Sequence, residues 1–342
     1  MKKTLVALSI LAAATSAQAI ELYNQDGVTV DIHGDIEVTY QNSFTESSMK
    51  QQIEDADFGF DVRYALNDDL QFGGYWAFDG SESNNAEVTR SGDVYVALYS
   101  KTYGSIKFGR LCTAVDDLGG ITSDYQFDVN KLYEAGSDDV TCADEAIRYD
   151  YDNGTFYTTL GFIQDKLGHS DLYTGEIVDD GNGNPVLEKV SGSDFNYYDG
   201  RFGYRVADLD MSVFIANLNF EDNSKGNDET AYGFEANYRG IESIRLGLGY
   251  YVADIDEAAG EANQDTNVIT LGADYYLGKW TFATAVSTSD HDNDKLDSTN
   301  WFVNAGYNLA PNTTAYIEYA GQDVDGKKDS EDALAIGVKA SF

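Results

Sequence analysis

The sequence predicts an all-β fold, a 16-stranded antiparallel transmembrane β-barrel with a long third loop folded into its lumen. Apolar and polar residues alternate with a period of two from end to end, whereas the helical period of 3.6 never holds for long. Short and long connections also alternate strictly, which is typical of barrels with tight turns at one end and long loops at the other. Most of the strands carry charged residues on one face, and burying those charges in a dry core would cost on the order of several kcal/mol each. The lumen is therefore predicted to hold water.

The predicted strands are runs of alternating residues, and residues 28–40 show the pattern most clearly. There Val30 and Ile32 fall on one face, and Asp31 and His33 fall on the other. The remaining predicted strands are 56–66, 70–79, 93–99, 105–110, 146–151, 155–164, 197–206, 210–218, 231–239, 244–252, 267–276, 280–288, 300–309, 313–320 and 332–342. The alternation places even-numbered apolar residues against lipid or a neighbouring subunit, for example Phe58, Phe60, Val94, Val96, Leu246 and Leu248.

The connections between the strands fall into two classes. The tight turns at one end include Asn153–Gly154, a dipeptide that favours a two-residue hairpin. The long, acidic loops at the other end are predicted at 41–55, 80–91, 111–145, 165–196, 219–230, 253–266, 289–299 and 321–331. Two soluble domains are the alternative for a chain of this length, but no linker or change of composition divides it.

The first 19 residues are predicted to be a secretory signal peptide, which leaves 20–342 as the mature barrel. Two lysines precede an apolar run from Leu5 to Ala14, and small residues ending at Ala19 mark the predicted cleavage site. No later stretch approaches the roughly 18 consecutive apolar residues of a membrane-spanning helix. We therefore expect export across the inner membrane into an oxidising compartment.

The mature chain is strongly acidic and rich in aromatic residues. Cleavage removes two of the 22 basic side chains and none of the 59 acidic ones, so the net charge falls from −37 to −39. Such a charge argues against nucleic acid as a partner. The 25 tyrosines, 17 phenylalanines and 3 tryptophans argue against disorder.

The longest connection, about residues 111–145, is predicted to be the functional loop. It runs for more than thirty residues without a strand pattern, and connections of that length are usually functional or disordered. The chain's two cysteines, Cys112 and Cys142, stand near its ends and are predicted to form a disulfide in an oxidising compartment. Closing a loop of about 30 residues stabilises a fold by about 3.5 kcal/mol on the chain-entropy estimate. Two separate buried thiols are the alternative.

The loop and the inner wall of the barrel supply the candidate pore residues. The predicted constriction acids on the loop are Asp116, Asp117, Asp124 and Asp128. The predicted wall residues are Asp35, Asp57, Arg63, Asp93, Arg148, Arg201 and Arg205. Because the arginines offset only part of this negative charge, and charges lining a narrow pore act across its width, we expect a preference for cations. The alternative is that most acids lie on external loops, where screening would leave the selectivity weak.

Other kinds of functional site find little support in the sequence. The three histidines, His33, His169 and His291, lack a neighbouring nucleophile and a metal-ligand spacing. Residues 290–294 begin like a calcium loop, but Lys295 stands where an EF-hand needs glycine. We predict neither an enzymatic activity nor a cofactor nor a metal site.

Two stretches and the C-terminus resemble one protein family. Residues 21–27 with 30–34 look like its opening strand, residues 103–110 look like the approach to its third loop, and the last strand ends on Phe342. The chain resembles the general, non-specific trimeric porins of Gram-negative bacteria. The resemblance implies a multi-pass homotrimer of the outer membrane, in contact with its lipid and lipopolysaccharide. It also implies passive diffusion of ions and small hydrophilic solutes through a channel that the third loop narrows.

The chain departs from that family at the pore. The family's Pro-Glu-Phe-Gly-Gly loop signature is absent, and residues 126–130 read Gln-Phe-Asp-Val-Asn instead. An ungapped match places Asp35, Asp57, Gly92 and Cys142 where well-known members carry basic residues on the inner wall. Two other functions stay open: a surface barrel whose loops serve as adhesin or receptor, and a substrate-specific sugar channel.

Overall fold

The computed structural model describes residues 19–80, 90–127, 142–165, 171–179, 185–191, 195–220, 228–255 and 265–342. Its strands are β1 (Ile20–Gln25), β2 (Val28–Ser43), β3 (Glu46–Ala65), β4 (Leu70–Asp79), β5 (Arg90–Ser100), β6 (Gly104–Cys112), β7 (Cys142–Asp152), β8 (Phe156–Asp165), β9 (Asp171–Asp179), β10 (Pro185–Ser191), β11 (Phe195–Val206), β12 (Leu209–Phe220), β13 (Glu229–Ile241), β14 (Ile244–Ile255), β15 (Thr266–Leu277), β16 (Trp280–His291), β17 (Ser298–Ala310), β18 (Thr313–Val324) and β19 (Glu331–Ser341). One short 3-10 helix, η1 (Ala114–Asp117), follows β6. Within the described residues, no helix has the length and apolar character needed to cross a membrane.

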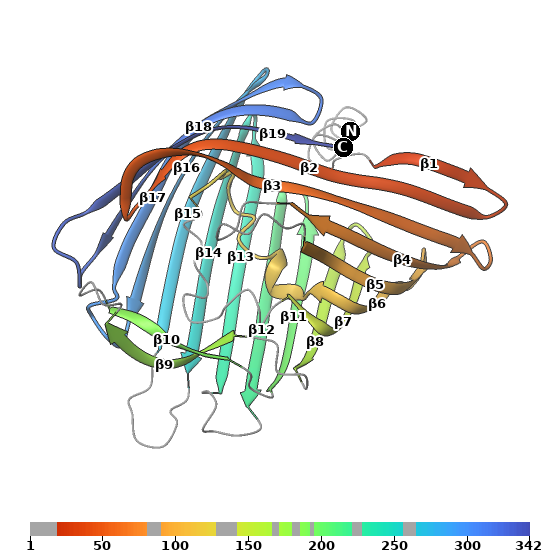
Figure 1. Cartoon of the computed structure of the whole chain (residues 1–342), viewed down its shortest axis with the longest axis horizontal. Coiled ribbons are helices and arrows are strands. Elements are labelled where there is room, and N and C mark those ends of the chain that lie inside the picture. The colour runs from red at the N-terminus through yellow and green to blue at the C-terminus, as the bar shows by residue number, and fades with distance from the viewer. Residues whose placement is uncertain are drawn as a thin grey trace.

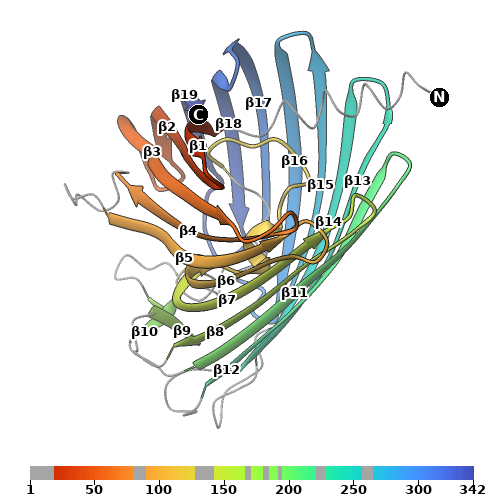
Figure 2. The ribbon, with the colours of Figure 1, turned by 90° about the vertical axis from the view of Figure 1, so that its right-hand side faces the viewer.

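The strands form a closed ring. Seventeen strands share one sheet, in which β1 is an added partner of β2, so that sixteen strands, β2 to β8 and β11 to β19, make up the ring. Neighbouring strands are antiparallel, and the ring closes where β8 pairs with β11 and β19 pairs with β2. Figures 1 and 2 show this ring from two directions. The predicted 16-stranded antiparallel barrel is confirmed.

Side chains along each strand alternate between an outward apolar face and an inward polar face. In β2, Ile36 and Tyr40 are each 50% exposed, whereas Glu37 and Thr39 are only 4% and 1% exposed. Because polar side chains on the inside lie against water or each other, the apolar surface faces outward, as a lipid bilayer requires. The outward residues include the predicted Phe58, Val94, Val96 and Leu246.

Three strand regions lie outside the predicted ranges. Residues 41–55 are predicted as a loop, but β2 continues to Ser43 and β3 begins at Glu46, which leaves a two-residue turn. The outer part of this hairpin is polar on both faces, as at Ser47 and Ser48, so it lacks the alternation that indicates a strand. The predicted loop 165–196 likewise contains the β9–β10 hairpin, and β1 precedes the first predicted strand.

The first described strand, β1, and the C-terminal residue both pair with β2. β1 pairs with residues 28–32 of β2 through a turn at Asp26–Gly27, whose positive φ angles of 55° and 78° suit a tight hairpin. Farther along, Gly34 and Phe342 exchange both backbone hydrogen bonds, at 2.9 and 2.8 Å. β1 therefore occupies the edge of β2 that β19 does not reach, and the seam of the ring has no long open edge.

Candidate functional site

The connection between β6 and β7 begins at a disulfide. Cys112 and Cys142 are register partners at the facing ends of these strands, and their sulfurs are bonded. The predicted disulfide is confirmed. It joins the two ends of the loop at its base, and η1 follows it directly.

Arg148 of β7 holds the start of the loop. Its guanidinium donates hydrogen bonds to the carbonyl oxygens of Cys112 and Thr113, at 3.2 and 3.1 Å. It also donates to both carboxylate oxygens of Asp117, at 3.0 and 2.8 Å, and to Asp150 at 2.8 Å. The Arg148 side chain is only 14% exposed. Its charge is therefore used within the wall to fix the first turn of the loop.

Carboxylates of the inner wall bind the backbone of the following residues, 113–127, which we call the anchored segment. Asp199 of β11 accepts the N–H of Val115 at 2.8 Å, and Glu235 of β13 accepts the N–H of Gly119 at 2.6 Å. A third acid, Asp274 of β15, accepts the N–H of Ser123 at 3.0 Å. Each acid thus accepts a hydrogen bond from a backbone N–H group that has no partner in a sheet or helix.

Glu318 of β18 and Glu37 of β2 bind the far end of the anchored segment. The Glu318 carboxylate accepts the N–H groups of residues 125, 126 and 127 at 2.9, 2.8 and 2.7 Å. The side-chain amide of Gln126 donates to Glu37 at 2.8 Å. The Tyr125 ring stacks on Tyr316 with 4.1 Å between centroids, and burial raises the pKa of Tyr125 to about 12. The segment therefore follows the inside of the ring from β6 past β11, β13, β15 and β18 to β2 (Figures 1 and 2).

The stretch of wall between the two ends of this segment is formed by β2 to β5, and it carries Asp35, Asp55, Asp57, Asp79 and Asp93, which we call the acidic wall. Asp35, Asp57 and Asp79 are direct cross-strand neighbours. Carboxylate oxygens of Asp35, Asp55 and Asp57 all lie within 4.8 Å of one another. Among the described residues, Lys339 of β19 is the base whose Nζ lies within 4.0 Å of two of these carboxylates, Asp35 and Asp55.

The arginines of the wall lie in ion pairs. The guanidinium of Arg63 contacts Asp61 at 2.6 Å and covers the ring of Tyr99 at 3.9 Å. Arg201 contacts Glu235 at 3.0 Å. Arg205 contacts Asp152 at 2.8 Å and Asp210 at 3.2 Å.

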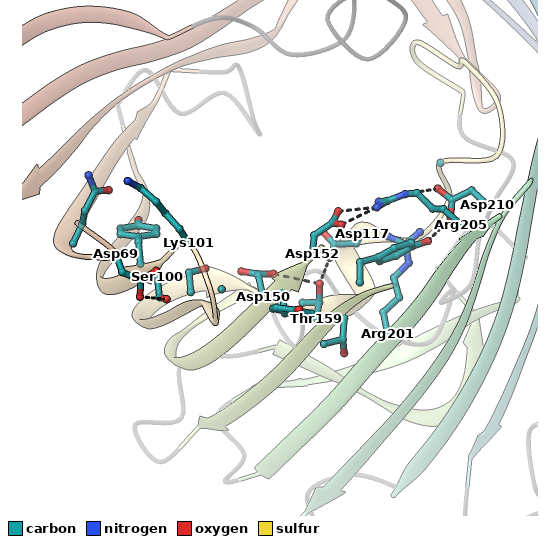
Figure 3. Close-up of a pocket in the computed structure, with 18 of the residues that line it drawn as sticks. Asp69, Ser100, Lys101, Asp117, Asp150, Asp152, Thr159, Arg201, Arg205 and Asp210 are labelled. Carbon is teal, nitrogen blue, oxygen red and sulfur yellow. Dashed lines mark hydrogen bonds and ion pairs between the residues drawn. The ribbon is translucent and has the colours of Figure 1, made fainter. Parts of the chain in front are cut away.

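Arg63, Arg201 and Arg205 line one cavity of about 650 Å³. Asp69 and Lys101, which lie at tight turns, also border it, as does Asp117 of η1. Figure 3 shows the Arg205 ion pairs on one side of this cavity and Asp150 with Thr159 beside them. The cavity therefore reaches from the loop toward the end of the barrel that carries the short turns.

The four predicted constriction acids of the loop do not share one environment. Asp117 accepts hydrogen bonds from Arg148 and from the Thr159 hydroxyl, the latter at 2.9 Å. Asp116 is exposed and close enough to Asp93 for the two carboxylates to repel each other. Asp124 is half-buried, and Asp128 lies outside the described residues.

Sequence reasoning did not find the carboxylates that bind the anchored segment. The alternation places Glu235, Asp274 and Glu318 on the inward face, but nothing in the sequence shows that their partners are backbone N–H groups more than 100 residues away. Asp199 and Glu37 escaped notice for the same reason. A regular series of inward acids near the middle of every second or third strand is the one signal that could have indicated them.

A closed ring that is apolar outside and charged inside, with a disulfide-closed loop bonded to its inner wall, defines an outer-membrane β-barrel channel. The profile of the family described as Gram-negative porin matches residues 4–327, and the chain belongs to this family. As predicted, it is a porin of the outer membrane, and its family is one of channels rather than enzymes.

Several relatives match over their full length and over that of this chain. Porin-like protein H of Photobacterium profundum is 27% identical over 363 residues, covering 100% of both chains. A monosaccharide porin of a Halomonas species is also 27% identical, over 387 residues and 100% of both chains.

Solved structures share the fold. A loop-deletion form of OmpT from Vibrio cholerae has a TM-score of 0.73 at 18% identity and covers 93% of this chain and 100% of its own. An anion-selective porin from Comamonas acidovorans also has a TM-score of 0.73, at 16% identity, with 92% and 100% covered. At this identity the likeness concerns the fold, so ion preference has to be argued from the residues of this chain.

Proposed function

We propose that this porin is a cation-preferring diffusion channel whose constriction lies between the anchored segment and the acidic wall. The observation that carries the proposal is the uneven pairing of the wall charges. Arg148, Arg201 and Arg205 each contact a carboxylate at 3.0 Å or less. In the acidic wall, by contrast, carboxylate oxygens of Asp35, Asp55 and Asp57 lie within 4.8 Å of one another. Among the described residues, the base within 4.0 Å of Asp35 and Asp55 is Lys339.

The acidic wall occurs in spite of its energetic cost. Like charges directly opposite one another destabilise a sheet, and Asp35, Asp57 and Asp79 stand in one cross-strand row. In a lumen narrowed by a loop, charges act across the opening because the Debye length is about 8 Å at physiological salt. Rings of carboxylates favour the passage of cations by this means. Asp116 adds a loop carboxylate to the same opening, and we assign Asp124 to its rim.

The zero-current potential of the porin in a planar bilayer under a KCl gradient tests this proposal. The wild-type potential should have the sign of a cation-selective channel. A unit charge about 8 Å from an ion changes the ion's energy by about 0.5 kcal/mol in water, which is roughly a twofold change in local cation occupancy. The double variant Asp35→Asn/Asp57→Asn should therefore lower the cation-to-anion permeability ratio severalfold.

A matched control removes the same charge far from the constriction. Asp325 and Asp329 are exposed and lie on the connection between β18 and β19, on the side of the long loops. The double variant Asp325→Asn/Asp329→Asn should leave the potential nearly unchanged, because salt screens distant charges. An anion-selective wild type, or equal shifts in the two double variants, would contradict the proposal.

We further propose that the porin is a homotrimer in contact with outer-membrane lipid and lipopolysaccharide and that it passes small hydrophilic solutes. A structural neighbour, OmpT of Vibrio cholerae at 17% identity, is described in a trimer form. The outward apolar belt offers surface for both lipid and subunit contacts. Chemical cross-linking in the native membrane should give a band of three subunits, and the mature N-terminus should be Ile20.

A further inference from the structure

We infer that Lys339 is a tethered counter-ion whose ammonium group sets how strongly this channel prefers cations; the inference rests on the proposed cation preference. Lys339 stands opposite Glu37 in the register between β19 and β2. Its Nζ lies 3.2 Å from Glu37, 3.9 Å from Asp55 and 4.0 Å from Asp35. One cation thus contacts three carboxylates on two strands.

The lysine and two of its carboxylates are open to the lumen. The neighbouring Val338 points outward, so Lys339 points inward, and its side chain is 39% exposed. The side chains of Asp35 and Asp55 are 29% and 30% exposed. Ions in the lumen therefore compete with Lys339 for the same carboxylates. A compact ammonium with three donors suits this arrangement better than a planar guanidinium would.

The position of Lys339 links it to the constriction. Glu37 accepts hydrogen bonds from Lys339, from the side chain of Gln126 and from the hydroxyl of Tyr316. Glu37 therefore connects Lys339 directly to Gln126, near the end of the anchored segment. Coulombic interactions also connect it with Asp57.

A purely structural ion pair is the competing interpretation. Partly exposed ion pairs contribute little to stability, because solvent screens them and ordering the side chains costs entropy. Such a pair would leave ion selectivity unchanged when it is removed. A tethered counter-ion predicts the opposite result, a change in selectivity without a comparable loss of stability.

Zero-current potentials of three variants test the inference. Lys339→Met removes the tethered charge and should raise the cation-to-anion permeability ratio by roughly twofold. Lys339→Arg keeps the charge and should stay close to the wild-type ratio. Lys327→Met removes a lysine that pairs with Glu331 at the long-loop end, and it should leave the ratio unchanged. Should Lys339→Met fail to assemble, Lys339→Gln offers the same loss of charge with a polar side chain.

Calcium gives a second measurement on the same proteins. Three carboxylates within 4.8 Å resemble the oxygen ligands of a divalent cation, and removing the ammonium leaves them without their counter-charge. Millimolar CaCl₂ should therefore reduce the conductance of Lys339→Met more than that of the wild type or Lys339→Arg.

The inference and the proposed function fail in different ways. An anion-selective wild type would overturn the proposed cation preference, whereas the shift between wild type and Lys339→Met would still measure the lysine. An unchanged ratio in Lys339→Met and Lys339→Gln, with wild-type sensitivity to calcium, would overturn the role of Lys339.

Discussion

The two sides of the lumen differ in how their charged side chains are paired. On the side formed by β7, β11 and β13, Arg148, Arg201 and Arg205 each lie against carboxylates, and backbone donors of the anchored segment use further acids there. On the side formed by β2 to β4, Asp35, Asp57 and Asp79 stand in one cross-strand row. Among the described residues, Lys339 is the base within 4.0 Å of Asp35 and Asp55 there. The first side has the charge pattern of a folded interior, and the second has the pattern of a surface that meets ions.

The comparison shows that pairing decides how a wall charge acts on a permeating ion. A guanidinium in contact with a carboxylate acts on a distant ion as a dipole, whose field falls faster than that of a single charge. Counting Arg63, Arg148 and Arg201 against the acids therefore overstates their effect on ions. If the proposed cation preference holds, the field that a permeating ion meets comes mainly from the acidic wall and not from these paired arginines.

A large loss of stability is expected from removing Arg148 on the paired side. Arg148→Met leaves Asp117 without its cation, leaves Asp150 with Lys107 alone, and removes the donor to the carbonyl oxygens at the base of the loop. Breaking a buried pair costs 3–5 kcal/mol, and the partial exposure of both acids, 28% and 27%, places this case near about 3 kcal/mol. Urea titration of the barrel in lipid vesicles measures this loss.

Arg205→Met is the control for that experiment. Its side chain is 37% exposed, so its pairs with Asp152 and Asp210 should contribute less than about 1 kcal/mol. If the two arginine variants lost the same unfolding free energy, burial would not explain how much each ion pair contributes to stability.

A second large effect concerns the covalent base of the same loop. Replacing Cys112 and Cys142 together by serine removes the link across a separation of 30 residues, which should lower the unfolding free energy by about 3.5 kcal/mol. Urea titration of this double variant should match that of wild type treated with reductant. Intact-mass measurement after alkylation gives the redox state directly, and two alkylated cysteines in unreduced wild type would contradict the bond.

The smallest expected effect has the opposite sign and belongs to the acidic wall. Asp57→Asn relieves repulsion from Asp35 and Asp79, so it should raise the unfolding free energy by roughly 0.2–1 kcal/mol. The same urea titration measures it, with Asp210→Asn as a control that should destabilise because Asp210 pairs with Arg205. Destabilisation by Asp57→Asn would show that this carboxylate serves the fold.

The sequence predicted most of the fold because a barrel wall repeats one local rule. Period-two alternation is visible wherever one face meets lipid, as at Phe58 and Val96, and the face cannot change without a slip in register. The rule fails where both faces meet water. The outer part of the β2–β3 hairpin, around Ser47 and Ser48, is therefore indistinguishable from a loop in the sequence.

The candidate site was less predictable because its contacts join distant parts of the chain. The alternation indicates that Asp117 and Arg148 belong to the pore, but only the fold shows that they pair with each other. It likewise places Lys339 on the inward face without showing that Asp35 and Asp55 surround it. The disulfide was predictable because two cysteines allow one pairing.

The hydrogen bonds of the anchored segment have a practical consequence for channel engineering. Asp199, Asp274 and Glu318 hold residues 113–127 largely through main-chain N–H groups, which every residue except proline supplies. The identity of most side chains on the segment is thus separate from its attachment. A library of substitutions at positions such as 116 and 124 could therefore change the ion selectivity of this nanopore while the hydrogen bonds that attach the segment to the wall are kept.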